Sequence, residues 1–416
     1  MPELTKKGDE PTASTNVSEN TNPVAQKEKS FPKKVKIFSL ASYLNDLGSE
    51  MISPIWPLFV TTFLGAPMAF LGFLDGLGEA LVSLSQAGSG MLSDKFKKRK
   101  IFILIGYFFS GAARIGYALS THFLWLIPFK IFDRLGKMRD APRDALLAEV
   151  TTRQNRGRAF GLLEAMDSLG AVSGIIASII LFKYLGFKNL FLLAAIPSII
   201  AVVFILFFIK EKPPKPDNRF QPLAFKKLDH NLKLFFFVSA VFGLGFFSYS
   251  FLLIFAKDFG FQTHEVPVLY LIFSLTTSFA AIPFGRLADR WRRKYLIITA
   301  YSFWGLTALG FLIVAESVAA FAFLFILYGL YKAALEPSQR SFLSELAPPE
   351  LKASVLGFFK MVMGIIALPA SFIAGILWTT FGSSAPFYFS LGLTATALIL
   401  IFFVQEKKAE EMVASE

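Results

Sequence analysis

The stretch GMLSDKFKKRK, residues 90–100, is a short and strongly basic connector between two apolar runs. About 195 residues later the chain repeats the pattern as GRLADRWRRK, residues 285–294, again between two apolar runs. Each copy has a glycine, an aspartate four residues on, a cation directly after it, and then a cationic run. The charge bias of a membrane surface explains the cations, but it does not explain the same Gly–Asp spacing in each half. The pair therefore indicates an internal duplication.

Both stretches resemble the loop signature of the major facilitator superfamily, Gly-x-x-x-Asp-Arg/Lys-x-Gly-Arg/Lys-Arg/Lys, found between helices 2 and 3 and again between helices 8 and 9. Lys97 and Arg292 stand where the family has its second glycine. The resemblance runs from about residue 34 to residue 406 and implies a twelve-helix secondary transporter. It also implies a conformational switch built from the loop residues and a partner on helix 4: Gly90, Asp94, Lys95, Lys98, Arg99, Asp144, Gly285, Asp289, Arg290 and Arg293.

The composition is typical of a polytopic membrane protein. Hydrophobic residues make up 54% of the 416 residues and charged residues only 17%, whereas soluble proteins average about 25% charged residues. The chain has no cysteine and only three scattered histidines, so it offers neither a disulfide framework nor a thiolate or histidine metal cluster. We expect no cofactor and no bound metal.

Twelve apolar segments of about membrane-spanning length follow a polar N-terminal stretch. We expect them near residues 37–63, 68–92, 101–119, 123–149, 158–181, 189–209, 233–256, 267–288, 295–315, 318–343, 354–378 and 385–404. Pro142 and Pro337 are separated by about the same interval as the two basic loops, and so are Gly161 and Gly357. The constant offset predicts two pseudo-symmetric six-helix bundles.

The predicted fold class is therefore an all-α membrane protein with twelve transmembrane helices. We expect a disordered cytoplasmic tail over 1–33, an N-terminal bundle over 34–209, a cytoplasmic linker over 210–232, a C-terminal bundle over 233–406 and a second tail over 407–416. Lysine and arginine are concentrated in the N-terminal tail, in the linker and in the connectors that follow the second, fourth and eighth apolar segments. The connectors that follow odd-numbered segments hold only Lys183, Lys188 and Lys257. The positive-inside rule then places both termini in the cytoplasm of a cell inner membrane.

Four carboxylates lie inside the first two apolar segments. Asp46 and Glu50 are four residues apart, hence on one helix face, and Asp75 and Glu79 repeat the spacing. A charge at mid-bilayer costs at least about 2.5–3.5 kcal/mol on insertion scales, so these groups should face a wet cavity, pair with cations or hold protons. We predict that they couple transport to protons, with Glu50 as the principal group and Arg134 as a cationic partner.

The fourth apolar segment carries the cations. Arg134 and Lys137 resemble the family's helix-4 motif Arg-x-x-Gln-Gly, which is linked to proton movement, although Lys137 and Met138 replace its last two residues. The resemblance therefore assigns a coupling role to Arg134 only. Asp133, Arg139, Asp140 and Asp144 are interpreted as a salt-bridge network, with Asp144 paired to the basic loop. Arg114 is interpreted as a packing or lipid-side residue.

The C-terminal half is rich in hydroxyl and aromatic side chains, and its deep charges are few. This asymmetry predicts coupling chemistry in the first half and substrate packing across both halves. The predicted substrate-binding residues are Asn45, Glu50, Glu79, Lys137, Tyr249, Tyr328 and Tyr331.

The sequence motifs favour some classes of function over others. No nucleophile–base pair, metal cluster or Gly-x-x-x-x-Gly-Lys-Ser/Thr loop is present, which argues against a membrane enzyme or an ATP-driven pump. The duplication favours alternating access over a channel or receptor. The principal hypothesis is a monomeric, proton-coupled exporter of a small amphipathic organic compound, without nucleic-acid partners. The alternative is transport of a metal ion or metal-chelate (siderophore-like), because carboxylates are hard oxygen ligands.

Overall fold

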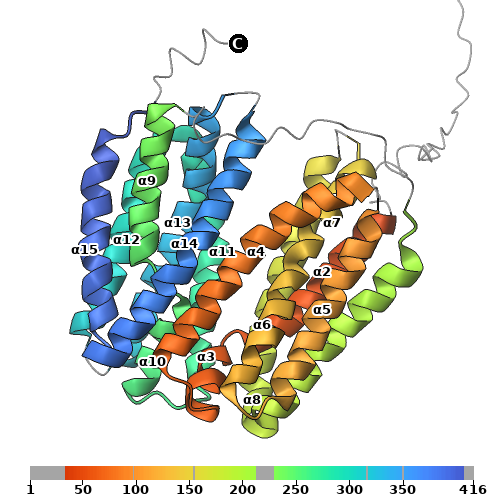
Figure 1. Ribbon diagram of the computed structural model, residues 1–416, viewed down its shortest axis with the longest axis horizontal. Coiled ribbons are helices and arrows are strands. Elements are labelled where there is room, and N and C mark those ends of the chain that lie inside the picture. The colour runs from red at the N-terminus through yellow and green to blue at the C-terminus, as the bar shows by residue number, and fades with distance from the viewer. Residues whose placement is uncertain are drawn as a thin grey trace, which may run out of the picture.

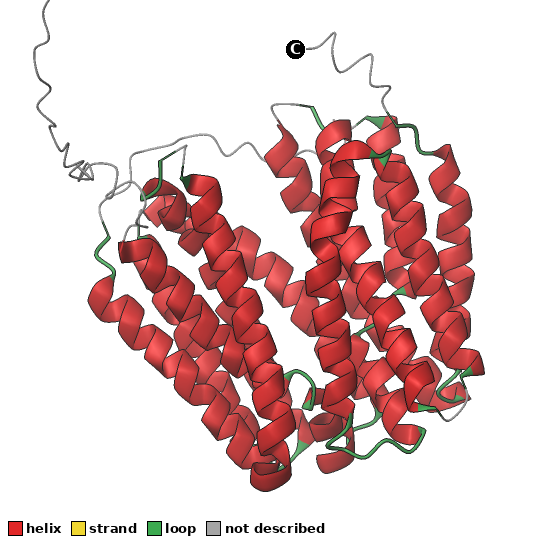
Figure 2. Ribbon diagram, turned by 180° about the vertical axis from the view of Figure 1, so that it is seen from behind, coloured by secondary structure: helices red, strands yellow, loops and turns green. Residues whose placement is uncertain are grey.

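The computed structural model describes residues 33–96, 98–152, 155–211, 229–314, 317–348 and 351–406. Within these ranges every regular element is a helix, as Figure 2 shows. The predicted tails, apart from Lys33, and most of the predicted linker lie outside the described residues. The all-helical fold class is confirmed.

The first half makes six passages through the bundle. Their elements are α2 (Lys33–Ile52) with α3 (Trp56–Leu58) and η1 (Phe59–Phe63), α4 (Met68–Phe96), α5 (Arg99–Leu119), η2 (Phe123–Trp125) with α6 (Leu126–Leu135), η3 (Gly136–Arg139) and α7 (Asp140–Glu149), and α8 (Arg156–Phe208). α8 contains the fifth and sixth passages, because Gly186 at φ 63° breaks it in the left-handed region that favours glycine.

The second half repeats the six passages. They are α9 (His230–Gly245) with α10 (Tyr249–Asp258), α11 (Val266–Arg290), α12 (Arg293–Ile313), α13 (Val318–Leu346), α14 (Lys352–Phe381), and α15 (Ala385–Leu400) with η6 (Ile401–Phe403). In the described residues nine helices are long and apolar enough to cross a membrane by themselves. The first and fourth passages fall outside that set because they are interrupted and charged, and α8 counts once for two passages.

Three of the helices predicted as continuous from the sequence are interrupted in the structure. The first passage turns at Pro54, which cannot donate a helical hydrogen bond. The fourth tightens to a 3₁₀ turn at Gly136, where a Cβ on neighbouring Gly106 would lie 2.6 Å from the Gly136 carbonyl oxygen. The seventh opens between Gly245 and Tyr249. A continuous helix would pair its own backbone N–H and C=O groups. At these breaks some of those groups are left for other partners in the middle of the bundle.

The duplication extends to individual hydrogen bonds. The backbone N–H of Arg99 donates to Glu211 at 2.5 Å, and that of Arg293 donates to Glu406 at 2.8 Å. The Arg99 guanidinium pairs with Glu149, and the Arg293 guanidinium pairs with Glu345 at 3.2 Å. The offset of about 195 residues read from the loops thus recurs in the contacts that fix the starts of α5 and α12.

The two bundles converge at one end and diverge at the other. Figure 1 shows them meeting near α3 and α10 and spreading toward the face on which the C-terminus lies. At the convergent end α4 and α14 are in backbone contact, since a Cβ on Gly72 would lie 2.1 Å from the Ser371 carbonyl oxygen and one on Gly375 would lie 2.5 Å from that of Met68. Small residues let membrane helices approach this closely. Lys34 and Lys210 are hydrogen-bonded on the divergent face.

Single cysteines in this cysteine-free chain should report which side of the membrane each face occupies. Thr121→Cys and Ser317→Cys, at exposed positions between helices, should react with an impermeant maleimide in intact cells. Lys98→Cys, exposed on the opposite face, should react only in everted membranes, because the positive-inside rule predicts a cytoplasmic location for the basic loops. The reverse labelling pattern would contradict the predicted orientation.

Candidate functional site

A cavity of about 790 Å³ lies between the two halves. Its lining runs from Asp75 and Ser371, beside the contact between α4 and α14, to Arg340 and Lys360 toward the divergent face. Cavities of this size hold drug-sized ligands. The structure is therefore closed where α4 and α14 touch and open on the face where the described chain ends lie.

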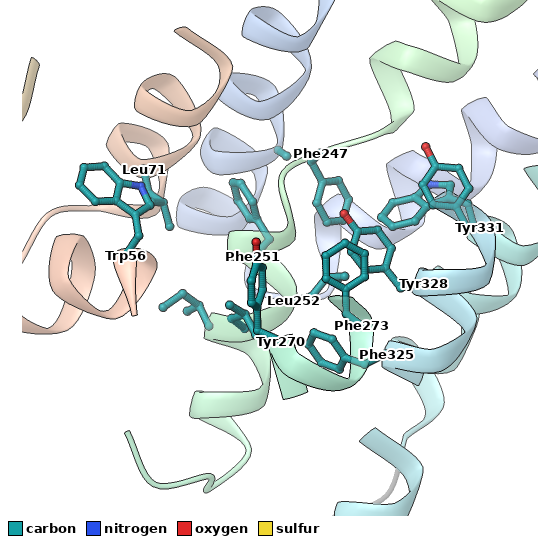
Figure 3. Close-up of a cluster of buried hydrophobic side chains, with 14 of the residues drawn as sticks. Trp56, Leu71, Phe247, Phe251, Leu252, Tyr270, Phe273, Phe325, Tyr328 and Tyr331 are labelled. Carbon is teal, nitrogen blue, oxygen red and sulfur yellow. The ribbon is translucent and has the colours of Figure 1, made fainter. Parts of the chain in front are cut away.

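The two walls of the cavity differ in chemistry. The N-terminal half contributes polar and charged groups, including Glu79, Gln86 and Arg134, but few aromatic rings. The C-terminal half contributes the aromatic rings of α9 and α13 together with the charged groups of Lys332, Glu336, Arg340 and Lys360. Tyr328 stacks on Phe273 at 4.6 Å between centroids and lies 5.9 Å from Tyr331. Figure 3 shows these rings in one buried cluster. The aromatic rings of the lining thus come mainly from the C-terminal half, but charged side chains come from both halves.

Asp75 is the centre of a buried polar cluster that joins the halves. Its carboxylate accepts hydrogen bonds from Trp56 Nε1 at 3.0 Å and from Lys130 Nζ at 3.2 Å, both in the N-terminal half. Ser248 at 2.7 Å and Ser250, at the start of α10 in the C-terminal half, donate to its other oxygen. Asp75 and Lys130 are 9% and 2% exposed, so their charges are removed from water together.

Glu50 makes a second contact between the halves. Tyr270 of α11 donates a hydrogen bond to its Oε2 at 3.0 Å, and nearby the Tyr249 hydroxyl donates to the Ser53 carbonyl at 3.3 Å. Glu50 also lines a smaller polar cavity of about 90 Å³ with Arg134 and Lys137. The hydrogen bonds of Glu50 to α11 and of Asp75 to α10 therefore join the two halves, and separation of the halves at this end would break them.

The salt-bridge network predicted for the fourth passage is present. Arg139 lies 3.7 Å from Asp140 and 3.8 Å from Asp46, and Arg143 lies 3.0 Å from Asp144 and 3.9 Å from Asp167. Asp144 is paired with Arg143 of its own helix, and its pairing with the basic loop stays a prediction. Asp46 is likewise engaged by Arg139, away from the cavity.

Asn45 and Arg114 form a buried unit inside the N-terminal half. Arg114 is 1% exposed and donates to the Asn45 carbonyl at 3.0 Å, to Ser49 at 2.7 Å and to Ser198 at 2.5 Å. Asn45 is fully buried and accepts from Ser198 at 2.9 Å. The lipid-side alternative for Arg114 is wrong, and Asn45 is not in the lining of either cavity, because its face of α2 packs on α5 and α8.

The remaining predicted binding residues divide between the two cavities. Glu79, Tyr328 and Tyr331 line the large cavity, Glu50 and Lys137 line the small one, and Arg134 and Tyr249 line both. Tyr328 and Tyr331 are 3% and 4% exposed, so only an edge of each ring meets the cavity.

Most of the predicted switch residues lie at helix ends on the divergent face, and the basic stretches are continuous with α4, α5, α11 and α12. Lys95 and Lys98 are exposed, Gly90 lies beside Ala141, and the glycine of the second loop, Gly285, has open space around it. The side chains of Asp94, Asp289 and Arg290 lie outside those that the structure describes.

Sequence reasoning missed Lys130, Trp56, Tyr270, Ser248 and Ser250 as site residues. Lys130 had a usable signal, since it is a lone cation within the apolar run 126–132. The two serines and Tyr270 had none, because hydroxyl side chains are common throughout the second half and only the packing of α10 and α11 on the first half selects these.

Duplicated six-passage bundles around a central cavity, open at one face, are typical of a multi-pass membrane transporter. A family model described as Major Facilitator Superfamily matches residues 38–262 and 234–415. The chain belongs to the Major Facilitator Superfamily, whose members are transporters and not enzymes. The resemblance read from the two basic loops is confirmed.

The chain is similar to named relatives over most of its length. It is 34% identical over 387 residues to an uncharacterized MFS-type transporter of Methanocaldococcus jannaschii, covering 91% of this chain and 96% of the relative. It is 24% identical over 392 residues to the multi-drug resistance efflux pump PmrA of Streptococcus pneumoniae, covering 88% and 93%. Among solved structures, a nucleoside transporter, NupG, superposes with a TM-score of 0.78 at 14% identity, covering 90% of this chain and 100% of that one. At that identity the likeness shows the fold alone.

Proposed function

We propose that this transporter is a monomeric, proton-coupled exporter of small amphipathic organic compounds. The observation that carries the proposal is the large cavity, which has charged groups on both walls and a cluster of aromatic rings on its C-terminal wall. Such a lining complements a compound with a polar end and an apolar body. Similarity to a multi-drug efflux pump supports the direction of transport.

In this proposal the coupling carboxylates act through the contacts between the halves. Glu50 is bonded to Tyr270 of α11, and Asp75 to Ser248 and Ser250 at the start of α10. Loss or gain of a proton changes the hydrogen bonds that each carboxylate can accept from the opposite half. Protonation therefore biases the equilibrium between a state open at the divergent face and a state open at the convergent end. Arg134, which lines both cavities, links the substrate side to the Glu50 side.

The loop residues complete the proposed cycle. Asp94 and its basic neighbours, with their counterparts at Asp289, form the cytoplasmic switch that the family resemblance implies. The cytoplasmic location of both termini rests on the lysine and arginine bias of the divergent face.

The metal alternative has weaker support. It requires several oxygen ligands around one point, but Asp75 is engaged by Lys130 and Asp46 faces Arg139. Among the residues that the structure describes, no three acidic or histidine side chains come together as a metal site. The carboxylates are more simply explained as proton carriers and ion-pair partners.

Transport into everted vesicles tests the proposal. Fluorescent amphipathic dyes of positive, zero and negative net charge are offered to vesicles whose lumen is acidified by respiration. We expect at least one dye to accumulate, and its accumulation to collapse when nigericin dissipates the pH gradient, with less effect when valinomycin and potassium dissipate the voltage. Accumulation that survives loss of the pH gradient, or transport only down the substrate gradient, would contradict proton coupling.

A further inference from the structure

Lys332 is a cation at mid-depth on the aromatic wall. It lies 14 residues along α13 from Val318, about 21 Å at 1.5 Å per residue, near the middle of the helix. It lines the large cavity and is exposed to it. Its ammonium lies 5.5 Å from the Phe273 ring centroid, and within the described residues no carboxylate oxygen comes within 4 Å of it. A charge kept at this depth without a direct partner calls for a functional reason.

Glu79 is its counterpart on the opposite wall. It lies 11 residues along α4 from Met68, about 16 Å, and so at a depth similar to that of Lys332. It is exposed in the same cavity, and in the described part of the chain no lysine or arginine nitrogen lies within 4 Å of its carboxylate. Two charges of opposite sign, neither in a direct ion pair within the described residues, therefore face one space from different halves.

The other charged groups in the lining are engaged elsewhere. Asp75 is bonded to Lys130, and Glu336 lies 3.6 Å from Arg340. Arg134 lies within electrostatic range of Glu79, but its nearest carboxylate is that of Asp133, at 3.4 Å. Lys360 lies closer to the mouth, within electrostatic range of Asp144 across the opening. Glu50 lies within electrostatic range of Lys332 but is hydrogen-bonded to Tyr270. Glu79 and Lys332 are left to interact with whatever enters the cavity.

We propose that the transported compound is a zwitterion, with an ammonium group that binds Glu79, an acidic group that binds Lys332, and an apolar or aromatic body against Tyr328, Tyr331 and Phe246. Tyr328 lies one helical turn from Lys332 on the same face of α13, so ring and charge are presented together. A purely anionic compound would leave Glu79 unpaired and repelling it, and a purely cationic one would do the same with Lys332. This inference rests on the proposed function only in taking the large cavity as the transport site.

Charge-matched probes test the inference on the purified full chain in nanodiscs. Nε-dansyl-lysine is zwitterionic, its Nα-acetyl derivative is an anion, and its methyl ester is a cation, so the three share one fluorescent body. A charge-assisted hydrogen bond contributes about 1.5–3 kcal/mol. We therefore expect the zwitterion to bind about tenfold or more tightly than either derivative.

The variants assign each end of the probe to one wall. Glu79→Gln should make the zwitterion and the anion bind alike, whereas Lys332→Gln should make the zwitterion and the cation bind alike. Lys332→Arg should keep the wild-type preference, and so should Lys360→Gln, the matched control nearer the mouth. Equal binding of all three probes by the wild type, no binding of any, or a preference unchanged in both Gln variants would overturn the inference.

The outcome is separable from that of the proposed function. If the charge preference holds but everted vesicles show no proton-driven accumulation, the coupling proposal fails and the zwitterion inference stands. If vesicles accumulate the anionic or cationic probe as well as the zwitterion, the transporter proposal stands and the zwitterion inference fails.

Discussion

Glu50→Gln is expected to abolish transport driven by a pH gradient while leaving substrate binding and downhill exchange within a few-fold of the wild type. Glutamine keeps an oxygen that can accept the Tyr270 hydrogen bond, now 3.0 Å long, but it cannot gain or lose a proton. The contact between α2 and α11 would then persist whatever the pH on either side. Accumulation in everted vesicles with an imposed pH gradient, compared with counterflow in its absence, measures the two properties separately.

Tyr270→Phe is the matched control for this prediction. It removes the hydrogen bond between the halves but leaves the carboxylate able to titrate. We expect the variant to retain gradient-driven accumulation at a reduced rate, with the convergent end opening more readily to an impermeant thiol reagent at an introduced cysteine. Full gradient-driven accumulation by Glu50→Gln would rule out Glu50 as the coupling group, and Asp46 would become the next candidate.

Lys130→Met is expected to be the most destabilising single change in the N-terminal half. It removes the cation beside Asp75, 3.2 Å away, and leaves a carboxylate buried with neutral donors only. Breaking a buried ion pair from one side costs about 3–5 kcal/mol. The loss should appear as a large fall in the temperature at which the detergent-solubilised protein loses its monodisperse gel-filtration peak.

The double variant Lys130→Met, Asp75→Leu separates the energy of the pair from damage to packing. Removing both charges relieves the unpaired group, so more than half of the lost stability should return. Transport should not return, because Ser248 and Ser250 would no longer have their acceptor in the other half. A double variant no more stable than the single one would show that the ion pair is not the source of the effect.

Much of the fold was readable from the chain. The two basic loops predicted a duplication, and the offset of about 195 residues recurs in the contacts of Arg99 and Arg293. Apolar runs of membrane-spanning length predicted every passage, because a segment that crosses lipid must be helical to satisfy its backbone and mostly apolar to lie in hydrocarbon. The breaks at Pro54, Gly136 and Gly245 were less visible, since membrane helices tolerate glycine and proline without ending.

The candidate site was readable in part. Glu79, Tyr328 and Tyr331 were identified from depth and residue type and do line the large cavity. Asn45 was chosen for the same reasons, yet it faces Arg114 inside the bundle. A difference of one position along a helix turns a side chain by about 100°, and the sequence does not say which face of a mid-membrane helix meets the cavity.

The sequence by itself determined the class of protein, the number of passages, the repeat and the residues that carry charge into the membrane. These follow from local properties: hydropathy over one helix length, charge at its ends, and spacing within one loop. Only the tertiary structure decided which charges pair, because partners such as Asp75 with Lys130, or Glu50 with Tyr270, come from segments far apart in the chain. The tertiary structure also places Glu79 and Lys332 in one cavity without a direct ion pair. That arrangement depends on how the two bundles pack against each other.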